Sequence, residues 1–295
     1  MVYKKKILIT GGAGFVGTNL IKLLLKKTNF NILSLDDYSS GSKSNHISNS
    51  RVKYIKGKTV NIANLVGNHK ELNSIFHFGE FARIYQSFPN MNECLESNSI
   101  GSNAVFNYCL KNKIKLIYSA TSASLGNSGN DKNLSPYAFT KAKNLELLEN
   151  LKKWFNFKFS IIYFYNVYGE RQISSGEMST VIGIFEEQFK KKKPLTVVLP
   201  GSQTRRFTYV QDTVNFCLNI WKSKKNGHFA ITNKKSYSIL EVAKMFSKNI
   251  KFLKARKGER FASALTDMNL NNKITKVYSK TNLKSYINNR INKLI

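Results

Sequence analysis

The chain has 295 residues, enough for one large α/β unit or two unequal domains, and no stretch of it approaches the ~20 apolar residues of a transmembrane helix. Its three cysteines, Cys94, Cys109 and Cys217, have neither the spacing of a metal site nor that of a disulfide framework, which favours a cytoplasmic protein without a metal. The chain has 47 Lys and Arg residues and 17 acidic residues, which gives a net charge of +30. The lysines are scattered and no RNA-binding motif accompanies them, so we expect no nucleic-acid partner.

A glycine-rich turn follows the first predicted strand. The apolar run Ile7–Ile9 reads as a buried strand, and apolar residues recur at helical spacing over Phe15–Leu25. Glycines between such a strand and helix let the backbone approach a pyrophosphate, which the free amides and positive dipole of the helix start then bind. A glycine turn without a ligand is the alternative. The cofactor-binding residues predicted from this turn are Gly11, Gly14, Phe15, Val16 and Gly17.

The second predicted strand, Phe30–Leu35, ends in two acidic residues. Asp36 lies about 20 residues after Gly17, where a carboxylate binds the adenosine ribose in dinucleotide-binding folds. A carboxylate there accepts hydrogen bonds from the ribose hydroxyls and repels a 2′-phosphate. We therefore predict NAD rather than NADP as the cofactor. The loop residues assigned to the same part of the site are Asp37, Tyr38 and Ser39.

Strands and helices continue to alternate along the chain. The further predicted strands are Val52–Ile55, Ser74–Phe78, Lys115–Ser119 and Phe157–Phe164, and the long predicted helices are Asn90–Leu110 and Pro136–Phe155. This order predicts an α/β protein with a Rossmann, doubly wound parallel sheet. From residue 166 the alternation breaks up. We assign 1–165 to an NAD-binding domain and 166–295 mainly to a smaller C-terminal substrate-binding domain, with the segment near 205–232 returning to the first.

The predicted chemistry lies after the strand that contains Lys115. Thr121 and Ser122 bring hydroxyls to the end of that strand, and Tyr137 and Lys141 are four residues apart on one face of a helix. A phenol has a reference pKa of about 10, and a neighbouring ammonium and an oxidised nicotinamide both favour the phenolate. The predicted catalytic residues are Thr121, Tyr137 and Lys141, of which Tyr137 and Lys141 also contact the cofactor, as does Phe78.

These motifs together resemble the extended short-chain dehydrogenase/reductase family, in particular its NAD-dependent nucleotide-sugar epimerases and dehydratases of the UDP-glucose 4-epimerase type. The resemblance extends from Lys6 to about Asp267. Further matching pieces are Phe76–Phe78 with Ser87, Asn98, Asn166–Gly169, Arg205 with Asp212, and Arg256–Glu259.

The resemblance implies a substrate site and a quaternary state. Asn166, Arg205 and Arg256 would bind the diphosphate of a nucleotide sugar, and Glu259 would contact the nucleotide ribose. By family frequency, the expected substrate is a UDP-linked sugar. It also implies a homodimer built on the two long helices and a role in making sugars for cell-surface polysaccharides.

Two departures from the family pattern concern the cofactor side. Lys58 replaces the acidic residue that usually meets the adenine. The usual His-x-Ala-Ala reads His77-Phe78-Gly79-Glu80, which places a carboxylate near the nicotinamide. A buried Glu80 needs a partner, and Arg83 is the candidate that the sequence offers.

The residues after Thr121 favour one reaction. The 4,6-dehydratases carry Asp-Glu there and the related decarboxylases carry a Glu, whereas this chain has Ser122-Ala123-Ser124. We therefore predict an isomerase: an NAD-dependent epimerase that acts at C4 through a transient 4-keto sugar. The alternatives are a 4,6-dehydratase, a 4-keto reductase with net cofactor turnover, or a non-catalytic basic scaffold that binds RNA.

Overall fold

A parallel sheet of eight strands runs through the molecule. The computed structural model describes residues 5–67, 70–125, 131–258 and 274–294. The strand order is β14-β11-β6-β5-β4-β1-β2-β3, and the paired neighbours are parallel. The strands are β1 (Lys6–Thr10), β2 (Asn31–Asp36), β3 (Val52–Lys56), β4 (Leu72–His77), β5 (Lys115–Thr121), β6 (Phe159–Phe164), β11 (Gly227–Thr232) and β14 (Ile274–Tyr278).

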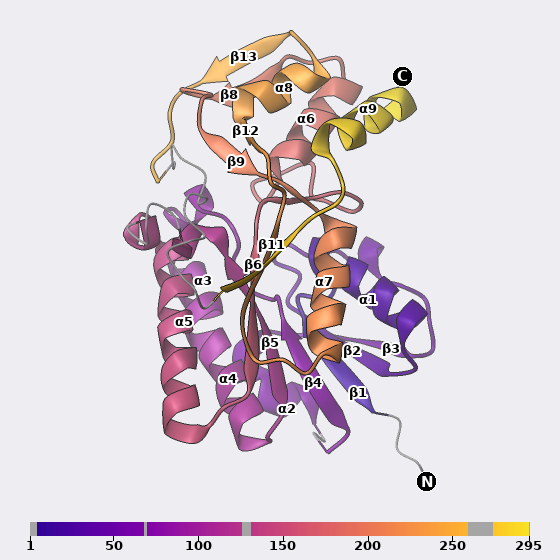
Figure 1. The fold of residues 1–295 in the computed structure, drawn as a ribbon, viewed down its shortest axis with the longest axis vertical. Helices are drawn as coiled ribbons and strands as arrows, with labels where there is room; N and C mark the ends of the chain where they lie inside the picture. Colours follow the sequence, from indigo (N-terminus) through magenta and orange to yellow (C-terminus); the bar gives the residue numbers. More distant parts are fainter. Residues whose placement is uncertain (1–4, 68–69, 126–130, 259–273, 295) are drawn as a thin grey trace.

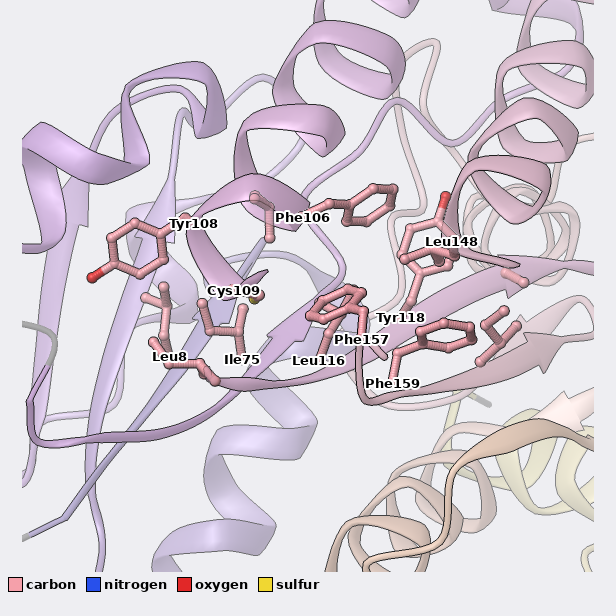
Figure 2. Packing of buried hydrophobic residues seen from close by; sticks show 14 of the residues in the cluster. Leu8, Ile75, Phe106, Tyr108, Cys109, Leu116, Tyr118, Leu148, Phe157 and Phe159 are labelled. Atoms are coloured by element: carbon pink, nitrogen blue, oxygen red, sulfur yellow. The ribbon is translucent and has the colours of Figure 1, made fainter. Parts of the chain in front are cut away.

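Helices cover both faces of this sheet (Figure 1). On one face lie α1 (Phe15–Lys27) and α7 (Val210–Lys222), which pack against each other over an apolar cluster that includes Leu20 and Val214. On the other face lie α2 (Ile62–Val66), α4 (Ser102–Lys111) and α5 (Pro136–Phe155). Figure 2 shows this second cluster, in which Phe106 of α4 and Leu148 of α5 lie over strand residues such as Leu116. The predicted doubly wound α/β fold is confirmed.

The predicted helix Asn90–Leu110 is not a uniform α-helix. It consists of α3 (Met91–Leu95), a π-helical segment (Glu96–Gly101) and α4. Asn98 in the π-helical segment is fully buried, its side-chain oxygen accepts from the Phe81 backbone amide at 2.7 Å, and its carbonyl accepts from Asn144 at 2.7 Å. Such bulges often lie at functional sites, and this one ties α5 to the loop that follows β4.

A third apolar cluster supports the part of the chain drawn in the upper half of Figure 1. It centres on Phe185 and Val242, and α6, α8 and α9 pack around it. The elements outside the main sheet are β7 (Val167–Tyr168), α6 (Val181–Lys190), β8 (Leu195–Val198), β9 (Thr204–Arg206), β10 (Thr208–Tyr209), β12 (Ser236–Ser238), α8 (Ile239–Phe246), β13 (Ile250–Leu253) and α9 (Leu283–Leu294). The C-terminal half also supplies two strands of the main sheet, because β11 pairs with β6 and β14 pairs with β11.

The chain order of the strands fixes where a ligand can bind. β1 lies between β2 and β4, so the chain leaves β1 to one side of the sheet and later returns on the other. In open α/β sheets, ligands bind at the carboxyl ends of the strands beside such a switch point. Among the described residues, no helix combines the length and the apolar character that crossing a membrane requires.

Candidate active site

A cavity of about 780 Å³ opens at the carboxyl ends of the central strands. The glycine turn lines one part of it, the ends of β4 and β5 and the start of α5 line its floor, and residues of the C-terminal half close it from above. The residues predicted for the site that line this cavity are Gly11, Gly14, Phe15, Val16, Gly17, Asp36, Asp37, Ser39, Phe78, Thr121, Ser122, Tyr137, Lys141, Asn166, Arg205 and Arg256. Residues more than 200 positions apart in the chain therefore share one space.

The glycine turn has the close packing that only glycine permits. Gly11 has φ of +71°, and a Cβ on it would lie 2.8 Å from the Gly79 amide nitrogen. A Cβ on Gly17 would lie 2.1 Å from the Gly11 carbonyl oxygen. The first turn of α1 opens directly onto the cavity, and its amide groups have no partner within the helix. This turn therefore fits the pyrophosphate of a dinucleotide.

Asp36 is held at the edge of the same cavity. Its carboxylate accepts hydrogen bonds from the backbone amides of Ala13 and Tyr38, both at 2.9 Å. Burial raises the pKa of Asp36 above its ordinary value, and the two amide hydrogen bonds oppose that rise. Asp36 thus joins the glycine turn to the loop after β2, which is where the ribose of the dinucleotide would lie.

Two residues on the side of the cavity predicted to bind the adenosine, Tyr38 and Lys58, make contacts that the sequence did not predict. Tyr38 is not among the residues that line the cavity, and its hydroxyl instead lies 2.9 Å from His46 Nε2. Lys58 does line the cavity, and its ammonium forms an ion pair with Glu96 at 2.7 Å. The cation that replaces the usual acidic residue is therefore matched by an anion from the π-helical segment.

The start of α5 fixes the position of Tyr137. Ser135 caps the helix, its hydroxyl accepting from the Ala138 amide at 3.1 Å, and Pro136 occupies the first turn, where its missing N–H costs nothing. The hydroxyl of the fully buried Ser87 accepts from the Tyr137 amide at 3.2 Å. Thr121 and Ser122 lie at the end of β5, beside the same cavity.

Lys141 lies one helical turn after Tyr137 and is almost completely buried. Its ammonium donates to the Glu80 carboxylate and to the Ser119 carbonyl oxygen. The expectation that Arg83 would be the partner of Glu80 is wrong, because the Arg83 guanidinium donates to the carbonyls of Met178 and Ala82. The loop after β4 turns Arg83 toward the segment before α6, while Glu80 faces α5 from below.

The predicted phosphate-binding residues lie on the opposite side of the cavity. Arg205 of β9 is buried, Arg256 stacks over the Tyr85 ring at 5.1 Å, and the Asn166 side chain donates to the Arg206 carbonyl at 2.9 Å. All three line the cavity, so two guanidinium groups face it together with the glycine turn. Glu259, the fourth predicted substrate residue, lies outside the described residues.

Two side chains that support the site, Ser102 and Asn144, were not predicted from the sequence. Both donate to Glu80 Oε1, at 2.7 Å and 3.1 Å. Asn144 carries a signal in the sequence, since it lies three residues after Lys141 on the same helix face. Ser102 carries none, because only the fold brings α4 against the loop after β4.

A parallel sheet with a glycine turn, a helix start and a buried carboxylate at its switch point is the arrangement of dinucleotide-binding proteins of the Rossmann class. The model of the NAD dependent epimerase/dehydratase family matches residues 7–233, so the chain belongs to that family. The match confirms the predicted family, the enzymatic class and NAD as the cofactor. The geometry of the glycine turn and Asp36 fits that cofactor.

Relatives in this family catalyse different reactions. A putative UDP-glucose 4-epimerase of Methanocaldococcus jannaschii is 27% identical over 232 residues, 74% of either chain. A dTDP-D-glucose 4,6-dehydratase of Dictyostelium discoideum is 26% identical over 271 residues, 82% of this chain and 62% of the relative. A crystal structure of UDP-glucuronic acid 4-epimerase from Bacillus cereus with UDP-glucuronic acid and NAD has 25% identity and a TM-score of 0.83, and the match covers 98% of this chain and 100% of that one.

Proposed function

We propose that the protein is a nucleotide-sugar 4-epimerase, with a UDP-linked hexose as its substrate. The observation that carries this proposal is that Thr121, Tyr137 and Lys141 share one cavity with the glycine turn and with Arg205 and Arg256. In the proposed complex, the glycine turn would bind the cofactor, Thr121, Tyr137 and Lys141 would lie at the reacting sugar, and the two arginines would bind the diphosphate. UDP-sugar epimerases among the relatives and structural neighbours support the choice of substrate.

The residues that line the cavity have different roles in the proposed reaction. NAD, when bound, supplies the acceptor and then the donor of the hydride exchanged with C4. Tyr137 takes the proton of the C4 hydroxyl as the carbonyl forms and returns it after the sugar has turned. The Thr121 hydroxyl hydrogen-bonds the reacting oxygen, and the Lys141 ammonium stabilises the phenolate. Arg205 and Arg256 hold the diphosphate, so the keto sugar can rotate without leaving.

The segment after β5 supports epimerisation over elimination. Removing water across C5 and C6 needs an added acid and base beside the sugar, and the chain has Ser122, Ala123 and Ser124 at that place. The buried Glu80 does not replace them, because its carboxylate is already engaged by Lys141. A set limited to Thr, Tyr and Lys is sufficient for oxidation and re-reduction at one carbon.

The test is to incubate the protein and catalytic NAD with a panel of UDP-hexoses and follow the anomeric protons by NMR. We expect a second hexose signal that grows to a fixed ratio without net NADH. Tyr137→Phe should lower kcat by about 10²-fold or more, the usual contribution of a positioned acid–base group, while Tyr278→Phe on the remote strand β14 retains activity.

Other outcomes assign other reactions. Consumption of NADH in a parallel incubation with a 4-keto nucleotide sugar and NADH indicates a 4-keto reductase, and a 4-keto-6-deoxy product from a UDP-hexose indicates a 4,6-dehydratase. No conversion across the panel, together with strongly salt-dependent RNA binding, would support the basic scaffold. Full activity of Tyr137→Phe would show that another group is the base.

We further propose that the enzyme acts in the cytoplasm, as a homodimer, and supplies sugars for cell-surface polysaccharides. Nucleotide sugars and NAD are cytoplasmic metabolites, which fits the scattered cysteines, all three buried as free thiols. Conversion of a cell-surface precursor sugar in the NMR panel would support that role.

A further inference from the structure

The carboxylate of Glu80 lies beneath the cavity, between β4, β5 and α5. Its side chain is 3% exposed and that of Lys141 is 5% exposed. One oxygen, Oε2, accepts from the Lys141 ammonium. The other, Oε1, accepts from Ser102 Oγ at 2.7 Å, from Tyr118 OH at 2.9 Å and from Asn144 Nδ2 at 3.1 Å. Four donors therefore converge on one buried carboxylate.

A chain of hydrogen bonds fixes the charge of this carboxylate. Thr10 Oγ1 accepts from the amides of Phe78 and Gly79, at 3.1 Å and 3.0 Å, so its own hydrogen points to His77 Nδ1, 2.7 Å away. His77 Nε2 then carries the proton and donates to Ser102 Oγ at 2.9 Å, and Ser102 donates to Glu80. Every bond in this chain points toward Oε1, and the Lys141 ammonium donates to Oε2, so both oxygens of Glu80 act as acceptors, as they do in the ionised form.

The charge of Lys141 depends on that carboxylate. Burial lowers the pKa of the Lys141 ammonium below its ordinary value of 10.5, and Glu80 opposes this fall. Burial by itself would raise the pKa of Glu80, but Lys141, His77 and the hydrogen bonds outweigh it and hold that pKa below 4.5. A buried ammonium without a partner loses its proton.

We propose that Glu80 is a positioning residue that keeps Lys141 protonated and fixes the position of its ammonium, one helical turn after Tyr137. The ammonium has three donor hydrogens, of which Glu80 and the Ser119 carbonyl accept two. The ammonium also lies over the Tyr118 ring, 4.3 Å from the ring centroid, and Lys141 lines the cavity, where its third hydrogen can be donated to a ligand. Glu80 and the Ser119 carbonyl hold the Lys141 Nζ atom in one position before any ligand binds. Ligand binding then does not have to order this long side chain, which would cost conformational entropy.

This inference rests on the proposed function only for the role of Lys141 in catalysis. The titratable groups that interact with the Lys141–Glu80 pair are His77 of β4, Cys94 of α3 and Tyr118 of β5, and Tyr137 lies one helical turn before Lys141 on α5. Of Glu80, His77, Cys94 and Tyr118, only Glu80 carries a formal negative charge at neutral pH, because burial lowers the pKa of His77 and raises the pKa values of Cys94 and Tyr118.

The first test compares the pH dependence of kcat in Glu80→Gln with that of the native enzyme. Without the carboxylate, Lys141 loses its proton at lower pH, so activity falls as pH rises. We expect the midpoint of the alkaline fall in kcat to move down by about one pH unit or more, so that kcat is about fivefold or more below the native value one pH unit above the variant's midpoint, with KM nearly unchanged. Glu80→Asp keeps the negative charge and should therefore restore most of the kcat at alkaline pH. A folded Glu80→Gln protein with a native profile would overturn the proposal.

A second test uses the native protein and needs no sugar. The side-chain ammonium of Lys141, assigned by its loss in Lys141→Arg, should keep its proton in ¹⁵N NMR spectra at pH ~8. Loss of that proton below neutral pH would overturn the proposal, even if Glu80→Gln did not fold. If no UDP-hexose is converted, but the ammonium persists in the native protein and loses its proton at lower pH in Glu80→Gln, the proposed reaction fails and the role of Glu80 stands.

Discussion

His77 has no exposed surface, and each of its ring nitrogens faces a hydroxyl group, Thr10 on one side and Ser102 on the other. Burial lowers the pKa of the His77 imidazole to about 4. The neutral ring connects β1 to α4, because it accepts a hydrogen bond from the Thr10 hydroxyl and donates one to the Ser102 hydroxyl. Its protonation would place a second cation beside Lys141, in a region with little water.

The buried His77 makes stability depend on pH. Its pKa is lower in the folded protein than in the unfolded chain, so the unfolded chain binds more protons between about pH 6.5 and pH 4. The stability that neutral His77 contributes is present above pH ~6.5 and is lost as pH falls toward 4. We expect the free energy of unfolding to fall by about 2 kcal/mol between pH 7 and pH 5.

Urea unfolding at the two pH values measures this effect. His77→Gln is the matched control, because its amide can still accept from one neighbour and donate to the other without titrating. An equal loss of stability in native protein and variant would assign the acid sensitivity to other groups.

At the scale of an element, α5 carries two of the three proposed catalytic side chains, and its apolar residues pack against the core. Tyr137 and Lys141 lie in its first turns, while Leu148 and Leu151 further along are buried against the sheet. The apolar end therefore anchors the helix, and its capped start sets where the two polar side chains enter the cavity. Their geometry depends on the cap as well as on the packing.

Removing the cap of α5 should reduce both stability and activity. We expect Ser135→Ala to cost about 1 kcal/mol in the free energy of unfolding, because the Ala138 amide loses its acceptor. It should also lower kcat, since Tyr137 follows within two residues. Ser238→Ala, at the capped start of α8, is the control: a similar cost in stability without the loss in kcat. Equal kcat in both variants would show that the cap does not position Tyr137.

At the scale of the whole molecule, the two long helical segments leave apolar side chains in solvent. The structure buries Val105, Leu148 and Leu151 in the core, so these residues cannot form the proposed dimer interface. Ile100 in the π-helical segment and Phe139 in α5 are 56% and 44% exposed. Exposed apolar groups on neighbouring helical segments support a proposed dimer through this face.

The dimer can be tested by sedimentation velocity at micromolar concentration. We expect a dimer for the native protein and a shift toward monomer for Ile100→Asp and Phe139→Asp, because a buried carboxylate disfavours the interface. Phe252→Asp on β13, at a side chain 48% exposed, should leave the dimer intact. A native protein that sediments only as a monomer would contradict the proposal.

Most of the nucleotide-binding half was predictable because its signals are local. The predicted helix Pro136–Phe155 has the bounds of α5, and the strand, turn and helix around Gly11 follow the pattern of residues 7–25. The π-helical segment was not predicted, because the buried contacts of Asn98 with Phe81 and Asn144 produce it. The Glu80 partner was misassigned for the same reason: Arg83 is near in sequence, whereas Lys141 is near only in space.

The sequence by itself determined the α/β class and the family, and it indicated the glycine turn, Asp36 and the Tyr137/Lys141 pair as candidate site residues, because periodicity, glycine spacing and helical offsets act over a few residues. Only the tertiary structure decided that Arg205 and Arg256 face the same cavity as the glycine turn, and that Thr10, His77, Ser102 and Glu80 form one chain of hydrogen bonds ending at Lys141. Such contacts join distant parts of the chain, and they are selected by the packing of strands and helices, which no short stretch of sequence encodes.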